Sequence, residues 1–78
     1  MKLEEVLRIV KRFLYDEMRA DYGTVRPIEA VLDENAARWN VTCEYQYSTT
    51  VSSSPETRIV ELKIDNIAEK IESFRQVK

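Results

Sequence analysis

The sequence predicts an α+β fold in which one N-terminal helix packs on one face of a three- to four-stranded antiparallel meander. Three observations predict it. Apolar residues recur with helical spacing through residues 2–22, two later segments alternate apolar and polar residues, and clusters of turn-forming residues separate the segments. The chain has 78 residues, of which 44% are hydrophobic and 33% charged. That length and composition are typical of one small domain, which we expect to span residues 1–78.

Residues 2–22 are predicted to form the helix. Their apolar residues fall on one stripe, and this stripe is the expected core face: Leu3, Val6, Leu7, Val10, Phe13, Leu14 and Met18. Gly23 suits the left-handed residue that often follows a helix, and Pro27 agrees with an end there.

Residues 27–33 are predicted to form a short strand, with Pro27 at its first position, where a missing N–H does least harm. Ile28, Ala30 and Leu32 would share its inner face. Residues 36–47 are the clearest strand, because six apolar residues alternate strictly with polar ones. These residues are Ala37, Trp39, Val41, Cys43, Tyr45 and Tyr47.

Residues 48–56 are rich in serine and are predicted to form a flexible hairpin loop. Residues 57–65 form the next predicted strand, with Val60, Leu62 and Ile64 on one face. The last segment, residues 66–78, fits two alternatives. As a helix it has Asn66 as N-cap, and as a strand it turns at residues 65–66 and pairs back on residues 57–64.

Three short patterns follow the helix in order: W-x-V-T-x-E at residues 39–44, V-E-L-x-I-D-N at 60–66 and I-x-S-F-R at 71–75. This order resembles small helix-plus-meander modules of the PepSY type and the folded part of gas vesicle protein O. The resemblance implies that the C-terminal segment is a strand. The matching positions are mostly core strand residues, so the resemblance concerns fold and not function. The last turn lacks the glycine and threonine that PepSY modules usually carry there.

Composition excludes several classes of active site. The chain has no histidine, one cysteine and one glycine, so it cannot build cysteine–histidine zinc sites, histidine-based catalytic dyads or glycine-rich phosphate loops. We therefore expect no enzyme activity, metal, cofactor or small-molecule ligand. No apolar run approaches the length of a membrane span, and the N-terminus lacks the pattern of a signal peptide. Together with the lone thiol, this favours a cytoplasmic protein.

The sequence offers one candidate nucleophile, the thiol of Cys43, and two candidate interaction surfaces. Cys43 is expected to be a buried structural thiol. The solvent-exposed face of the helix carries a basic stripe that could bind nucleic acid or an acidic partner. The stripe consists of Arg8, Lys11, Arg12 and Arg19 around Tyr15.

The second candidate surface is the sheet face opposite the helix. It would expose Val31 and Ile59, together with Phe74 if the C-terminal segment is a strand. A half-apolar face of this kind predicts a protein-interaction module, and we expect it to form a homodimer or to bind another protein.

Overall fold

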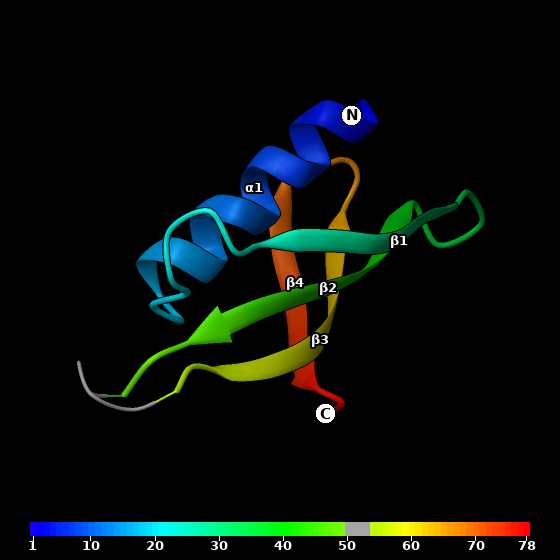
Figure 1. Ribbon diagram of the computed structural model, residues 1–78. Helices are drawn as coiled ribbons and strands as arrows, with labels where there is room; N and C mark the ends of the chain where they lie inside the picture. The colour runs from blue at the N-terminus through cyan, green and yellow to red at the C-terminus, as the bar shows by residue number, and fades with distance from the viewer. Residues whose placement is uncertain (50–53) are drawn as a thin grey trace.

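The computed structural model describes residues 1–49 and 54–78. One helix precedes four strands that form a single antiparallel sheet in the order β1-β2-β3-β4. This confirms the predicted α+β meander, and the C-terminal segment is a strand and not a helix (Figure 1). The elements are α1 (Leu3–Asp16), β1 (Arg26–Asp33), β2 (Arg38–Tyr47), β3 (Glu56–Asp65) and β4 (Lys70–Gln76).

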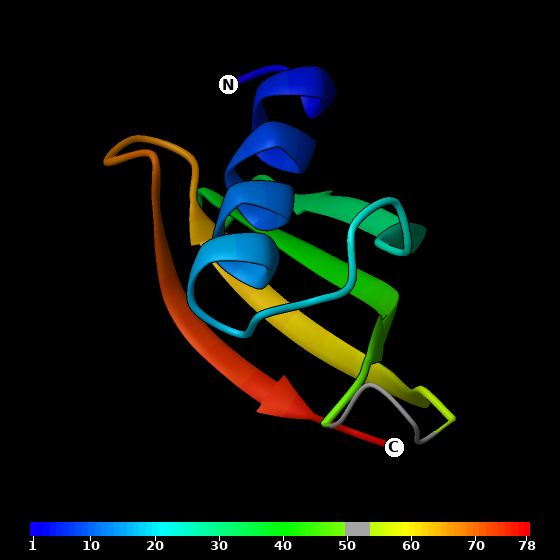
Figure 2. The same ribbon diagram turned by 60° about the vertical axis from the view of Figure 1, so that its left-hand side comes forward.

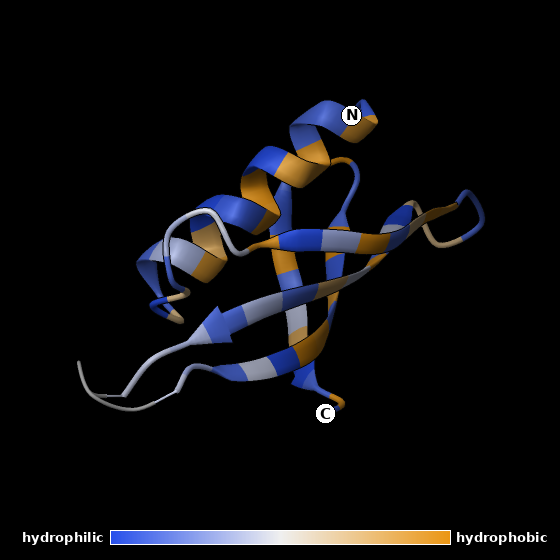
Figure 3. Ribbon diagram, in the orientation of Figure 1, coloured by the Kyte–Doolittle hydropathy of each residue, from blue (hydrophilic) through white to orange (hydrophobic). Residues whose placement is uncertain are grey.

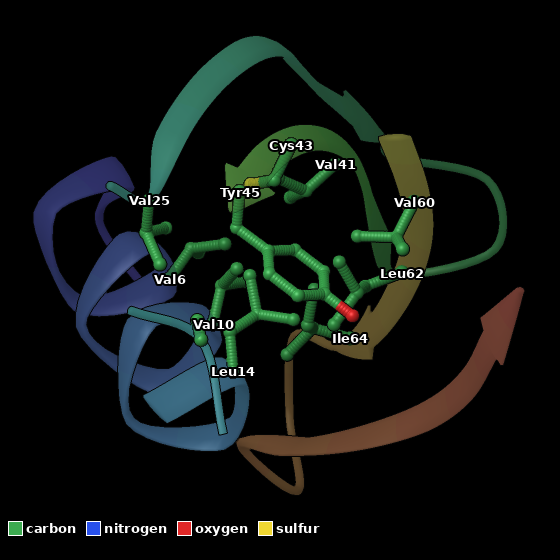
Figure 4. Packing of buried hydrophobic residues seen from close by; sticks show 11 residues of the cluster. Val6, Val10, Leu14, Val25, Val41, Cys43, Tyr45, Val60, Leu62 and Ile64 are labelled. Carbon is green, nitrogen blue, oxygen red and sulfur yellow. The ribbon is translucent and has the colours of Figure 1, made fainter. Parts of the chain in front are cut away.

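The helix lies against one face of the sheet, and the strands curve around it (Figure 2). The core forms between the helix stripe and the inner faces of β2 and β3, with the ring of Tyr45 near its centre (Figure 4). Each large apolar side chain buried here contributes about 1.5–3 kcal/mol relative to exposure. The fully buried members are Val6, Val10, Leu14, Val41, Cys43, Tyr45, Val60, Leu62 and Ile64.

The predicted helix end at residue 22 is wrong. The helix ends at Asp16, and Arg19 takes the left-handed conformation expected of a residue after a helix, with φ of 55°. The Ala20 N–H donates to the Leu14 carbonyl at 2.9 Å, which closes the last turn. The chain must turn this early because Ala20 and Val25 are buried against the sheet. Gly23, with φ of 77°, lies further along in this connection.

β1 begins one residue earlier than predicted, so that Pro27 is its second residue, and Ile28 departs from its predicted face. The register with β2 shifts between Pro27 and Glu29, so Ile28 is an extra residue in the strand and is 55% exposed. A one-residue shift moves side chains to the other face of a sheet. The predicted inner-face position of Ile28 is therefore wrong, whereas Ala30 packs against the core as expected.

Two hairpin turns of the same design join β1 to β2 and β3 to β4. Asp33 accepts the backbone N–H groups two and three residues on at 3.1 and 3.2 Å, and Asp65 does the same at 2.8 Å for both. Each turn ends on a left-handed residue, Ala37 or Glu69. Because Ala37 has this conformation, β2 begins at Arg38 and not at residue 36.

The hairpin between β2 and β3 is confirmed by the pairing of Tyr47 with Glu56. The centre of the predicted flexible loop, residues 50–53, lies outside the described residues.

Candidate interaction surfaces

Cys43 is fully buried on the inner face of β2, as predicted. Burial raises the pKa of its thiol to about 11, and the positive charge of Lys11 offsets only part of that effect. The reactive thiolate is therefore scarce at neutral pH. Within the described ranges, no three acidic or cysteine side chains come together as a metal site requires.

Tyr45 is the other buried polar group of the core. Its hydroxyl has no hydrogen-bond partner in the part of the chain that the structure describes. Tyr45 pairs in register with Arg58 on β3 and is the main influence that raises the pKa of that guanidinium. The contact between the two groups nevertheless falls short of hydrogen-bond geometry. A buried hydroxyl without a hydrogen-bond partner lowers the free energy of unfolding.

The structure brings together only part of the predicted basic stripe. Arg8 and Arg12 lie one turn apart on the flank of α1 that faces β4. Lys11 lies three residues after Arg8 and therefore next to it on the helix surface, where the two line a second hollow with Glu4 and Leu7. Arg19 lies beyond the helix end and leaves the stripe.

Tyr15 has a structural partner. Its hydroxyl accepts the backbone N–H of Gly23 at 3.1 Å, and its ring lies 6.3 Å from that of Tyr22. These contacts tie the connection after α1 back onto the helix. The ring is therefore less free to stack on a base than an unpaired tyrosine ring would be.

Apolar and polar residues alternate along the strands (Figure 3). On the open sheet face, the two predicted apolar residues do not adjoin each other. Val31 is 48% exposed on β1, and Ile59 is half-buried on β3, with β2 between them. Their register partners on β2 are Asn40 and Glu44. Two ion pairs also link the strands: Arg75–Glu61 at 2.8 Å joins the neighbouring strands β4 and β3, and Arg38–Glu72 at 2.7 Å reaches from β2 to β4 past β3.

The predicted place of Phe74 on the open face is wrong. Its ring lies 5.4 Å from that of Phe13, so it faces the helix. The register of β4 shifts at Glu72, which leaves both Ile71 and Phe74 on the inner face although they are three positions apart. A bulge explains why the apolar spacing of this strand also fitted a helix.

The inward-facing Ile71 helps to form a groove between α1 and β4 that sequence reasoning missed. Its volume is about 550 Å³, and its apolar floor consists of Ile9, Phe13 and Ile71. The charged residues around it are Arg8, Arg12, Asp16, Glu17 and Glu69. None of these five forms an ion pair with another described residue. The available signal was Ile9, which lies at the margin of the helix stripe.

The groove borders one of the two sheet edges. The edge at β1 contains Pro27, which has no N–H to donate, and the bulge at Ile28. The edge at β4 has no proline, and all its residues keep their N–H groups. The backbone N–H of Val77 donates to the carbonyl of Ile59 on β3. Successive N–H groups of a strand point alternately toward and away from the neighbouring strand. The backbone N–H groups of Phe74 and Gln76 therefore point away from the sheet.

Comparison with models of protein families, with curated proteins and with solved structures yields no match to this chain. The resemblance to PepSY modules and gas vesicle protein O therefore extends only to the arrangement of an N-terminal helix and a four-stranded meander. Among the described residues, no helix has the length and apolar character needed to cross a membrane.

Proposed function

We propose that the protein is a non-enzymatic protein-interaction module that works through the groove between α1 and β4. The observation that carries the proposal is the position of this groove beside the edge of β4. A partner there gains backbone hydrogen bonds from the strand and apolar contact with Ile9, Phe13 and Ile71. Its charged groups meet rim residues that have no ion pair among the described residues.

The proposal includes self-association and a cytoplasmic location. Small domains gain stability by burying apolar surface against a second copy. The use of a single cysteine, Cys43, supports the location, because disulfide-rich chains are typical of secreted proteins and rare in the cytoplasm. The likeness to PepSY modules and gas vesicle protein O contributes the expected fold and no biological role.

The test compares two interaction surfaces by retention of proteins from an extract of the native host. The immobilised chain is compared with the groove variant Arg8→Glu/Arg12→Glu and with the open-face variant Ile59→Lys. We expect a retained protein to be lost from the groove variant and kept by Ile59→Lys. The opposite pattern moves the interface to the open sheet face around Val31 and Ile59. Retention that neither variant changes counts against an interaction module of this kind.

A second candidate function is binding of nucleic acid or an acidic protein by the basic face of α1. Arg8, Lys11 and Arg12 are exposed, and none forms an ion pair within the described part of the chain. Phosphate binding by such residues weakens steeply as salt rises. Anisotropy of a labelled single-stranded oligonucleotide, titrated with the chain at several salt concentrations, tests this candidate. Absence of binding at low salt rejects it for nucleic acid.

A further inference from the structure

We propose that the occupant of the α1–β4 groove is the β4 strand of a second copy, so that two sheets join edge to edge around a two-fold axis. This inference rests on the proposed function and names its partner. Three features of the described residues support it: the hydrogen-bonding groups of β4, the apolar residues on its inner face, and the order of charges along α1.

The backbone of β4 is suited to pairing with itself. The N–H groups of Phe74 and Gln76 point outward, and both residues lie on the inner face of the sheet. Two copies of β4 in antiparallel alignment therefore present donors and acceptors to each other. A dyad at Arg75 would place like charges directly opposite each other, which is unfavourable. The axis therefore passes beside Phe74 and not through Arg75.

The apolar side chains of a second β4 strand would cover the apolar residues that the groove leaves half-exposed. Ile71 and Phe74 are only half-buried within one chain. A second β4 strand would bring another Ile71 and another Phe74 to the same inner face. The four side chains would then continue the core that Phe13 begins through its contact with Phe74. Aromatic pairs near a two-fold axis add attraction beyond the area that they bury.

The charges along α1 are self-complementary in this arrangement. A two-fold axis perpendicular to the sheet reverses the direction of the partner helix. Phe13 lies at the level of Phe74, close to the axis. Arg8 lies before this level, and Asp16 and Glu17 lie after it. Reversal therefore places the basic part of one groove opposite the acidic end of the other. Opposite charges in such an alignment fix the register of the pair.

The first measurement is sedimentation velocity of the purified chain over a range of concentrations. We expect a concentration-dependent dimer in the micromolar range. Gln76→Pro removes an outward N–H that β3 does not use, and it should weaken the dimer by at least about tenfold. The matched control is Gln76→Ala, which keeps the N–H and should dimerise like the wild type. Ile59→Lys, on the open face, should also leave the dimer unchanged.

Charge exchange tests the same interface without touching the strand. Arg8→Glu should weaken the dimer, because it places two acidic groups opposite each other, and Arg8→Glu/Asp16→Arg should restore it. Both positions are exposed on α1, so these variants keep the fold, and circular dichroism checks this.

Three results would overturn the inference. They are a monomer at every concentration, a dimer that Gln76→Pro leaves intact, and a dimer that Arg8→Glu alone leaves intact. Each leaves open the retention of a different protein by the groove, which is the separate test of the proposed function.

Discussion

Trp39 on β2 donates its indole N–H to the side-chain oxygen of Asn66, 27 residues later, at 3.0 Å. The backbone N–H of Asn66 also donates to the carbonyl of Ala37 at 2.9 Å. The turn between β3 and β4 is thereby fastened to the start of β2. Because β4 lines one side of the groove, these bonds help to set the position of the groove.

Asn66→Ala should lower the free energy of unfolding by about 1–2 kcal/mol, because a half-buried indole N–H loses its acceptor. Urea unfolding followed by tryptophan fluorescence measures this. Asn35→Ala in the matching turn between β1 and β2 is the control, since Asn35 uses its backbone N–H there. Equal losses for the two variants would show that the Trp39 bond is not the source of the effect.

Leu14→Ala should destabilise the protein by about 2–5 kcal/mol, because Leu14 is fully buried and its loss leaves a cavity under α1. Leu3 lies on the same helix stripe but is 46% exposed. Leu3→Ala should therefore cost less than about 1 kcal/mol. Thermal and denaturant unfolding of the two variants gives the comparison. If Leu14→Ala melts like the wild type, the helix does not pack on the sheet as described.

Tyr45→Phe should leave the stability unchanged or raise it by about 1 kcal/mol, because the variant removes a buried hydroxyl that has no partner among the described residues. The ring and its packing stay the same. Tyr47→Phe serves as control, since Tyr47 is only half-buried and its ring contacts Arg58 at 4.3 Å. A marked loss of stability in Tyr45→Phe would mean that the hydroxyl has an acceptor or donor in the folded protein.

Cys43 should resist thiol reagents in the native protein and react once denaturant is added. Burial raises the pKa of its thiol to about 11, so both access and ionisation are restricted. The raised pKa stabilises the fold below the unfolded value of about 8.5, and this contribution disappears as the pH rises through the folded value. Ser54→Cys adds an exposed thiol as internal control. Labelling of both thiols at one rate in the native state would contradict the burial.

Asp65 makes stability depend on acidic pH. The backbone N–H groups of Ala68 and Ile67 lower the pKa of its carboxyl group below the usual value. A lowered folded pKa gives stability that is present above the unfolded value of about 3.9 and is lost as the pH falls through the folded value. Asp65→Asn keeps an acceptor oxygen but cannot ionise. Its unfolding free energy should therefore change less between neutral pH and pH about 3 than that of the wild type. Parallel pH profiles would exclude this role for Asp65.

The class of the fold and most of its core follow from the amino-acid pattern alone. Apolar residues occupy every second position on two strands: Val41, Cys43 and Tyr45 on β2, and Val60 and Leu62 on β3. Each strand therefore has one apolar face, and only one pairing register buries both of these faces together. The apolar stripe of the helix must pack against another apolar surface, and the inner face of the meander provides that surface. These are local patterns, so a single sequence contains them fully.

Three features depend on how distant parts of the chain pack together: the end of α1, the inward direction of Phe74 and the groove beside β4. The helix signal continued past Asp16, but burial of Ala20 against the sheet stops it there. The inward position of Phe74 depends on a bulge at Glu72, which arises from pairing with β3. The groove lies where α1 meets β4, which is an edge strand of the curved four-stranded sheet (Figure 2). Each of these depends on contacts between residues distant in sequence, which no local pattern encodes.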